Sequence, residues 1–396
     1  MPHAHLAALA AAAVKSKRLL SSMFLLCLTI ASSPVQAQTQ AAQVDQVDHL
    51  LQAQIQKRGI PGLQVAIVQR GRIILLRAYG LESVESAVPV TNRSIFPLNS
   101  ITKTFTGVAA MQLVEAGKLD LDAPASRYLD NLPTPWRAIT VRQLFSHTSG
   151  LPDIVDEELR LLVDGDEAAS WAKVQALPLE AAAGERFKYN HTNYVLLGRI
   201  IDKLAGKPFT QLIKEQQFDV VGMPTTGYFD ARDVVPHIAR SYRYVNAAEG
   251  GKKLNTRYEV WAPSLLTATG INTTAEELAR WTIALQQGRL LHSKAALKTL
   301  WTPARLNDGS TAGFSSFING YAIGWPTVER AQHRALVSGG GARAALAIYP
   351  EDDLTIIILT NLLGASPVQF VDEIAALYLP SMQVEQSAPP RPASAR

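Results

Sequence analysis

Cysteine is almost absent from this 396-residue chain, which contains a single one, Cys27. It lies inside an apolar segment near the N-terminus that has the pattern of a secretory signal, so we expect the mature protein to contain no thiol. That absence excludes thiol catalysis, Cys-ligated zinc and disulfides. A chain of this length buries enough apolar surface to fold without them.

An excess of charge of one sign is also missing. The chain has 38 Lys and Arg residues against 34 Asp and Glu residues, and Lys15, Lys17 and Arg18 lie in the predicted signal. The other 35 basic residues nearly balance the 34 acidic ones. Nucleic-acid binding needs a basic stripe, which this sequence lacks, so we expect no nucleic-acid partner. The histidines form no metal motif such as H-E-x-x-H, and we expect neither a metal nor a cofactor.

No apolar run is long enough to cross a bilayer comfortably. The longest near the N-terminus, Leu19–Ala31, follows basic residues and precedes small residues at Val35–Ala37. This order is typical of a signal peptide, which we assign to residues 1–37. The protein is then expected to be exported to an oxidising compartment such as a periplasm, with no membrane span after signal removal. A buried N-terminal helix is the alternative.

Apolar periodicity predicts strands at both ends of the chain and helices between them. Two hairpins are expected, Leu63–Gln69 with Ile73–Ala78 and Ala344–Tyr349 with Leu354–Thr360. Helical spacing marks Gln43–Gln56, the stretch after Ser100, Val195–Leu204 and Pro367–Tyr378.

This order predicts an α+β fold in which one antiparallel sheet is flanked by helices. We assign the sheet to residues 43–90 and 265–380, and an inserted helical sub-domain to residues 91–264. Together they form a single catalytic domain, residues 38–380. The polar stretch Asp230–Tyr258 is expected to shape the substrate pocket, and residues 381–396, rich in Pro, Ala and Ser, to be disordered.

Ser100-Ile101-Thr102-Lys103 places a lysine one turn after a serine at a predicted helix start. A buried lysine of lowered pKa can take the proton of a serine hydroxyl and make it a nucleophile. From this motif alone, a serine that caps the helix is an equal alternative. Ser170-Trp171-Ala172-Lys173 has the same form but lies within a polar helical stretch, and we expect no chemistry there.

The wider chain resembles class C β-lactamases and their relatives among DD-peptidases and serine esterases, from about Gly59 to Asn361. The matching blocks are Ile60–Gly62, Asn99–Lys103, Leu113–Leu119, Leu144–Leu151, Phe187–Tyr189, Tyr194–Gly198, Tyr321–Trp325 and Leu359–Asn361. The resemblance implies the β-lactamase/transpeptidase-like fold and Ser100 as the nucleophile.

The second motif of such enzymes is Tyr-x-Asn in the class C branch, and here it reads Tyr189-Asn190-His191. The resemblance implies that Tyr189 relays a proton together with Lys103. His191 replaces the asparagine and is a candidate to bind the substrate carbonyl. Asn190 or Asn193 is an alternative source of the missing amide.

The third motif, usually Lys or His, then Thr or Ser, then Gly, reads Val337-Ser338-Gly339. Ser338 and Gly339 are expected to bind substrate, and the Gly340 N–H to form the oxyanion hole with that of Ser100.

Valine cannot replace the cation that holds a substrate carboxylate in relatives. Arg343 or His333 are candidates to do so instead. We therefore expect weak activity on β-lactams and D-Ala-D-Ala ends, and prefer an uncharged ester, amide or lactone.

His147 and Ser149 allow a triad interpretation, but His147-Thr148-Ser149-Gly150 reads more simply as a structural turn. Our leading hypothesis is an exported serine hydrolase, an esterase or amidase that forms an acyl-enzyme with a small acyl substrate. The alternatives are a DD-peptidase or weak β-lactamase, and a catalytically inactive binding protein on the same scaffold.

Overall fold

The computed structural model describes residues 34–248 and 250–382. The chain divides into two units, Met1–Ala42 and Gln43–Arg396, and helix α1 (Pro34–Arg58) crosses this division. The predicted signal peptide and C-terminal tail lie almost wholly outside the described residues. Within the described ranges, no helix is both long and apolar enough to cross a membrane. All the described strands lie in the unit that begins at Gln43.

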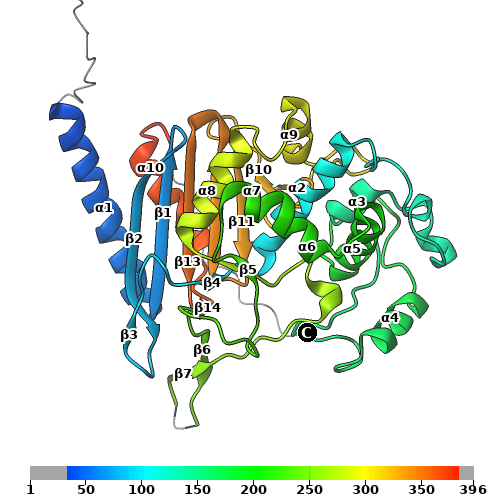
Figure 1. Cartoon of the computed structure of the whole chain (residues 1–396), viewed down its shortest axis with the longest axis horizontal. Helices are drawn as coiled ribbons and strands as arrows, with labels where there is room; N and C mark the ends of the chain where they lie inside the picture. Colours follow the sequence, from blue (N-terminus) through cyan, green and yellow to red (C-terminus); the bar gives the residue numbers. More distant parts are fainter. Residues whose placement is uncertain (1–33, 249, 383–396) are drawn as a thin grey trace, which may run out of the picture. The chain divides into compact units, whose positions relative to one another are not determined.

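One eight-stranded antiparallel sheet joins the two ends of this unit (Figure 1). Strand β1 pairs with β13 from Leu63↔Thr360 to Gln69↔Leu354, so the first and last strands meet at its centre. This confirms the predicted α+β fold with an antiparallel sheet. In sheet order the strands are β3 (Val88–Pro89), β2 (Arg72–Ser83), β1 (Gly62–Gln69), β13 (Leu354–Thr360), β12 (Ala344–Tyr349), β11 (Ala335–Gly340), β10 (Pro326–Val328) and β9 (Gly320–Tyr321).

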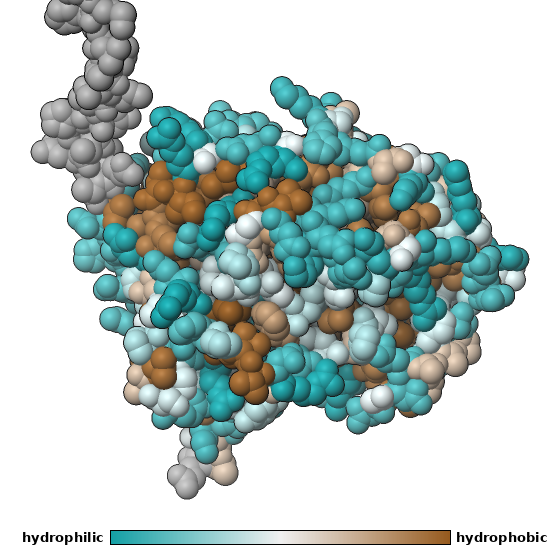
Figure 2. Space-filling model, viewed as in Figure 1, coloured by the Kyte–Doolittle hydropathy of each residue, from teal (hydrophilic) through white to brown (hydrophobic). Residues whose placement is uncertain are grey.

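Both faces of the sheet are buried. Successive side chains of a strand point to opposite faces, so in β13 Ile356 and Ile358 join one apolar cluster while Ile357 and Leu359 join the other. The first cluster packs against α1 and α10 (Val371–Tyr378), and the second against α2 (Thr102–Glu115) and α8 (Ala275–Gln286). Outside this core, hydrophilic residues cover most of the visible face (Figure 2).

Helices dominate the segment between Ser100 and Leu266, as predicted, but strands interrupt it. The hairpin of β6 (Tyr242–Asn246) and β7 (Lys252–Thr256) lies inside the polar excursion, where β6 pairs in parallel with β14 (Leu362–Leu363). The predicted closing helix divides into a 3₁₀ turn, Pro367–Gln369, and α10. The remaining helices are α3 (Val141–Phe145), α4 (Glu167–Ala176), α5 (His191–Ala205), α6 (Phe209–Ile213), α7 (Asp219–Val221) and α9 (Lys294–Trp301).

A three-stranded sheet contains the strand that precedes Ser100. Strand β8 (Ile271–Thr273) lies between β4 (Phe96–Pro97) and β5 (Gly227–Tyr228). Directly after β4, the Leu98 N–H donates to the carbonyl of Ile271, 2.8 Å away. The segment before Ser100 is thereby held along one side of β8, and β5 lies on the other side.

Gln64 links the main sheet to this region. Its side chain is fully buried in β1, and its amide nitrogen donates to the carbonyls of Thr91 and Ser94. Its amide oxygen accepts from the N–H of Ala275 at the start of α8, at 2.8 Å. One side chain therefore satisfies backbone groups from two segments that pack on the sheet.

We predict that Gln64→Leu lowers the free energy of unfolding by about 3 kcal/mol, because three backbone groups lose their partner inside the core. Urea denaturation measures this. Gln287→Leu, at an exposed position just after α8, is the control and is expected to change stability by less than about 0.5 kcal/mol. Equal effects of the two substitutions would contradict the linking role of Gln64.

Candidate active site

Ser100 lies in a tight turn, Asn99–Ile101, that runs directly into α2. Asn99 has a φ of +45°, a left-handed conformation that asparagine tolerates better than most residues. Neither the turn nor α2 has a side-chain cap. The interpretation of Ser100 as a helix cap is therefore wrong, and its hydroxyl makes other contacts.

The glycine-rich end of β11 packs against this turn. A Cβ added to Gly340 would lie 1.9 Å from the carbonyl oxygen of Leu98, and one added to Gly341 would lie 2.9 Å from Oδ1 of Asn99. Only residues without a side chain allow such an approach. The two glycines thus bring the backbone of the strand end next to Ser100.

Lys103 points back to Ser100 from the first turn of α2. Its Nζ lies 3.3 Å from the Oγ of Ser100 and 3.0 Å from the carbonyl oxygen of Ala268. It also lies 4.7 Å from the ring centre of Tyr189 and 5.1 Å from that of Tyr194. The residue is 1% exposed, and burial lowers the pKa of Lys103 to about 7, although the charge of Asp153 opposes this shift. The amine is thus neutral in a large fraction of molecules near neutral pH.

Tyr189 completes the group. Its hydroxyl donates to the Oγ of Ser100 at 2.9 Å. Burial raises the pKa of Tyr189 far above its ordinary value, with the hydrogen bond to Ser100 acting in the opposite direction. The phenol therefore keeps its proton at neutral pH, and Lys103 is the only one of the pair that is poised to accept a proton.

These groups open into a cavity of about 220 Å³. Ser100, Tyr189 and Ser338 supply its polar side chains, and Gly339 contributes backbone. Apart from the hydroxyl of Tyr321, the rest of the lining is apolar: Phe314, Ile318, Tyr321, Pro326, Val337, Ala342 and Val368. None of these lining residues carries a charge, and none belongs to the excursion at 230–258, so the expectation that this excursion shapes the pocket is wrong.

His191 lies against Tyr189 rather than in this lining. Its ring is perpendicular to that of Tyr189, with centres 5.4 Å apart, and the residue is 9% exposed. Both its backbone N–H and its Nδ1 contact the carboxylate of Asp153, at 2.9 and 3.1 Å. Asp153 was missed in the sequence analysis, because it follows the turn at 147–151 without any motif of its own. The Asp153–His191 pair supports the Tyr189 ring from the side.

Asn190 and Asn193, the alternative sources of the missing amide, make structural contacts instead. Asn190 caps α5 through the N–H of Asn193 and donates to the carbonyl of Leu151 at 2.7 Å. Asn193 accepts from the hydroxyl of Ser149 at 2.6 Å. Both amides therefore hold the turn at 147–151 against α5.

His147 is structural, as the simpler interpretation predicts. Its Nδ1 accepts from the N–H of Asn190 at 3.1 Å, while Ser149 donates to Asn193 instead. Burial, together with the charge of Lys103, holds the pKa of His147 well below its ordinary value. Its ring packs on that of Tyr189 with centres 4.4 Å apart. A neutral imidazole thus packs on the ring of Tyr189 and helps to hold it in place.

The second Ser-x-x-K sequence has no such surroundings. Ser170 lies in α4, where its hydroxyl contacts both backbone groups of Val163. Lys173 donates to the carbonyl of Leu162 at 3.2 Å from an exposed position. These contacts fasten one loop to one helix, which agrees with the absence of chemistry expected there.

Arg343 and His333, the two candidates to replace the missing cation, make structural contacts instead. Arg343 is fully buried and donates to the Oγ of Ser241 and to the carboxylate of Glu259, at 2.8 and 3.0 Å. His333 contacts the carboxylate of Asp352 at 3.0 Å and the hydroxyl of Ser381 at 2.9 Å. Neither side chain is free to bind a substrate in the cavity of Ser100, so the assignment of Arg343 to substrate binding is wrong.

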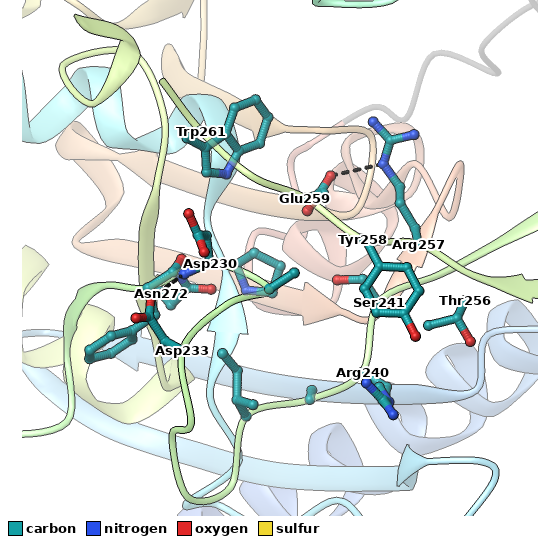
Figure 3. Close-up of a pocket in the computed structure, with 15 residues that line it drawn as sticks. Asp230, Asp233, Arg240, Ser241, Thr256, Arg257, Tyr258, Glu259, Trp261 and Asn272 are labelled. Carbon is teal, nitrogen blue, oxygen red and sulfur yellow. Dashed lines mark hydrogen bonds and ion pairs between the residues drawn. The ribbon is translucent and has the colours of Figure 1, made fainter. Parts of the chain in front are cut away.

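A second cavity lies under the polar excursion (Figure 3). Its wall includes Tyr258 and Trp261, and a dashed line in Figure 3 joins Glu259 to Arg257, 3.0 Å apart. Asp230 also forms an ion pair, with Arg232 at 2.6 Å, and the carboxylate of Asp233 accepts from the N–H of Asp230 at 2.9 Å. It contains no serine–lysine pair, so we place the chemistry at Ser100. In the described part of the chain, no group of His, Cys, Asp and Glu residues is arranged to hold a metal.

The sequence and fold together define the class of protein. The family model "Beta-lactamase" matches residues 47–379, and the chain belongs to this family. Among curated proteins, it is 27% identical over 325 residues to Protein flp of Staphylococcus aureus (strain N315), covering 80% of this chain and 63% of that protein. Penicillin-binding protein 4* of Bacillus subtilis (strain 168) is 28% identical over 313 residues, covering 75% of this chain and 67% of that one. The chain thus spans less than two thirds of the length of flp.

Solved structures show the same fold. The octameric penicillin-binding protein homologue from Pyrococcus abyssi superposes with a TM-score of 0.72 at 24% identity, covering 85% of this chain and 77% of that one. EstCE1, a hydrolase with promiscuous acyltransferase activity, has a TM-score of 0.69 at 22% identity, with 87% and 100% covered. D-alanine carboxypeptidase AmpC from Burkholderia cenocepacia has 0.68 at 21%, with 86% and 99% covered.

We predict that Lys103 loses its proton near pH 7, because its burial disfavours the charged form. Carbon-13 labelling of the lysine side chains allows each ammonium group to be titrated by NMR. One resonance is expected to titrate near pH 7 and to vanish in Lys103→Met. A set of resonances that all titrate near the ordinary lysine value of 10.5 would contradict this account of the site.

Proposed function

We propose that the protein is an exported serine hydrolase that forms an acyl-enzyme at Ser100 with an uncharged small acyl substrate, as an esterase or amidase. The observation that carries this proposal is the position of one hydroxyl between a buried amine and a phenol: Oγ of Ser100 lies 3.3 Å from Lys103 and 2.9 Å from Tyr189. Members of this family are generally serine hydrolases. The proposal of export rests on the signal pattern of residues 1–37.

In the acylation step, neutral Lys103 accepts the proton of the Ser100 hydroxyl as Oγ attacks the carbonyl carbon. The N–H groups of Ser100 and Gly340 are the proposed donors to the resulting oxyanion. When the intermediate collapses, the bond to the leaving group breaks. The proton on Lys103 then reaches the leaving group through the hydroxyl of Tyr189, which passes on its own proton and takes the one from Lys103.

Water completes the cycle by the same route in reverse. Lys103, neutral again, accepts a proton from water by way of Tyr189, and the hydroxide equivalent attacks the acyl carbon. The Ser100–acyl bond then breaks, and Oγ recovers a proton from Lys103. The acid is released and all three side chains return to their initial protonation states.

The composition of the cavity supports an uncharged substrate. Its lining holds Val337 where relatives place a cation, and Arg343 and His333 are bound elsewhere. A carboxylate brought into this apolar lining would lose its hydration without gaining a counter-ion. An uncharged ester, amide or lactone therefore ranks above the peptides of a DD-peptidase, and these above β-lactams.

An inactive binding protein on this scaffold is the second candidate, because His191 and Val337 both depart from the family motifs. The position of Lys103 argues against it. Burying an ammonium group costs free energy, and a scaffold gains nothing from placing one 3.3 Å from a serine hydroxyl. The arrangement therefore supports a serine that is deprotonated during a reaction.

Ser100→Ala is expected to reduce hydrolysis of p-nitrophenyl acetate by at least about a thousandfold, to the background rate, because the nucleophile is gone. Ser170→Ala removes the matching serine of the second Ser-x-x-K sequence and is expected to keep the wild-type rate within about twofold. The release of p-nitrophenol measures both.

The wild-type rate should also fall as the pH drops below about 7, where Lys103 gains a proton and can no longer act as the base. Benzylpenicillin should be hydrolysed far more slowly than the ester. Wild-type and Ser100→Ala proteins with equal rates would overturn the proposed mechanism. Penicillin turnover as fast as ester turnover would overturn the choice of an uncharged substrate.

A further inference from the structure

Phe314 is a large apolar side chain that is left half exposed at the mouth of the Ser100 cavity. It is 50% exposed and lines this cavity. Its ring centre lies 5.2 Å from that of Tyr189, 5.3 Å from that of Phe187 and 6.0 Å from that of Tyr321. One side of the Phe314 ring therefore packs on the aromatic cluster that includes Tyr189, while much of its surface remains available.

The turn that carries Phe314 is held in one conformation. The N–H of Ser315 donates to the carbonyl of Ile318 at 3.1 Å, and the N–H of Ile318 donates back to the hydroxyl of Ser315 at 3.0 Å. Asn319 then donates to the carbonyl of Glu329 at 2.9 Å and accepts from its N–H at 2.8 Å. Because this turn is already ordered, Phe314 and Ile318 lose little conformational entropy when a ligand binds.

A second apolar surface comes from the segment before α10. Val368 lines the same cavity, and its Cγ2 lies 3.0 Å from the position of a Cβ on Gly339. Val337 and Pro326 extend the apolar lining between the two segments. The cavity of about 220 Å³ exceeds the roughly 150 Å³ that accommodates benzene in an apolar protein cavity. It has room for a phenyl ring or a short alkyl chain.

We propose that this lining is an acyl-binding subsite and that Phe314 is its main specificity-determining residue. The preferred substrate is an uncharged ester or amide whose acyl group is apolar, either an alkyl chain of about four to six carbons or a phenyl ring. This inference rests on the proposed function, because it assigns the lining to the acyl group that Ser100 receives. The acyl group stays in the site through both chemical steps, so contacts with it act throughout the cycle, whereas the leaving group departs after the first.

The test compares p-nitrophenyl acetate, butyrate and hexanoate, which share one leaving group and differ only in the acyl chain. Each added methylene is expected to raise kcat/KM by about threefold, because it leaves water for the apolar lining. Phe314→Ala is expected to lower kcat/KM for hexanoate by about fivefold to tenfold more than it lowers kcat/KM for acetate. Tyr258→Ala removes an aromatic ring that is 70% exposed beside the second cavity, and is expected to change neither substrate.

Binding to the Ser100→Ala variant separates this inference from the proposed function. Equilibrium dialysis should show that this variant, which cannot cleave the esters, binds hexanoate at least about tenfold more tightly than acetate, and that Phe314→Ala in the same background lowers this ratio by about fivefold to tenfold. Equal binding of the two esters overturns the subsite whether or not the wild type hydrolyses them. Hydrolysis that requires Ser100 but is equally fast for all three chains overturns the subsite and leaves the proposed function intact.

Discussion

The burial of one ammonium group constrains the whole site. Among the described residues, Nζ of Lys103 hydrogen-bonds to the hydroxyl of Ser100 and the carbonyl of Ala268, and the ring centres of Tyr189 and Tyr194 lie 4.7 and 5.1 Å from it. A charged ammonium group is unfavourable in such buried surroundings. Burial therefore lowers the pKa of Lys103 to about 7, so both protonation states are populated near neutral pH. The same enclosure keeps Tyr189 protonated. The site therefore contains one base and one proton donor, and both contact one hydroxyl.

Holding these groups together requires segments from most of the chain. Helix α2 is fastened to residues 267–271 by Thr102, Lys103 and Thr106, and that segment continues into β8, which pairs with the strand before Ser100. The turn at 147–151 and the start of α5 fix Tyr189 through His147 and the two asparagines. The glycines after β11 let the main sheet approach the Ser100 turn. The pairing of β1 with β13 joins the two ends of the unit in one sheet.

Sequence patterns predicted the elements and contacts that are determined by residues close together in the chain. The hairpin β12–β13 was predicted with the bounds that the structure has, because both strands are continuous apolar runs buried on two faces. The Ser-x-x-K spacing predicted the contact of Lys103 with Ser100, since residues three apart in a helix lie on the same face. The hairpin β6–β7 was missed because its sequence is polar and β6 forms by pairing with β14, about 120 residues later. Arg343 was misassigned and Asp153 overlooked because their partners, Glu259 and His191, are identified only by the tertiary fold.

The central claim is that Ser100 becomes covalently acylated, and the most direct measurement is mass spectrometry of the protein quenched with acid during turnover of p-nitrophenyl hexanoate. The account predicts an intact mass increased by one hexanoyl group, located on the peptide that contains Ser100 and absent in Ser100→Ala. An adduct on another residue, or turnover in which rapid acid quenching from the earliest times captures no adduct, would contradict it.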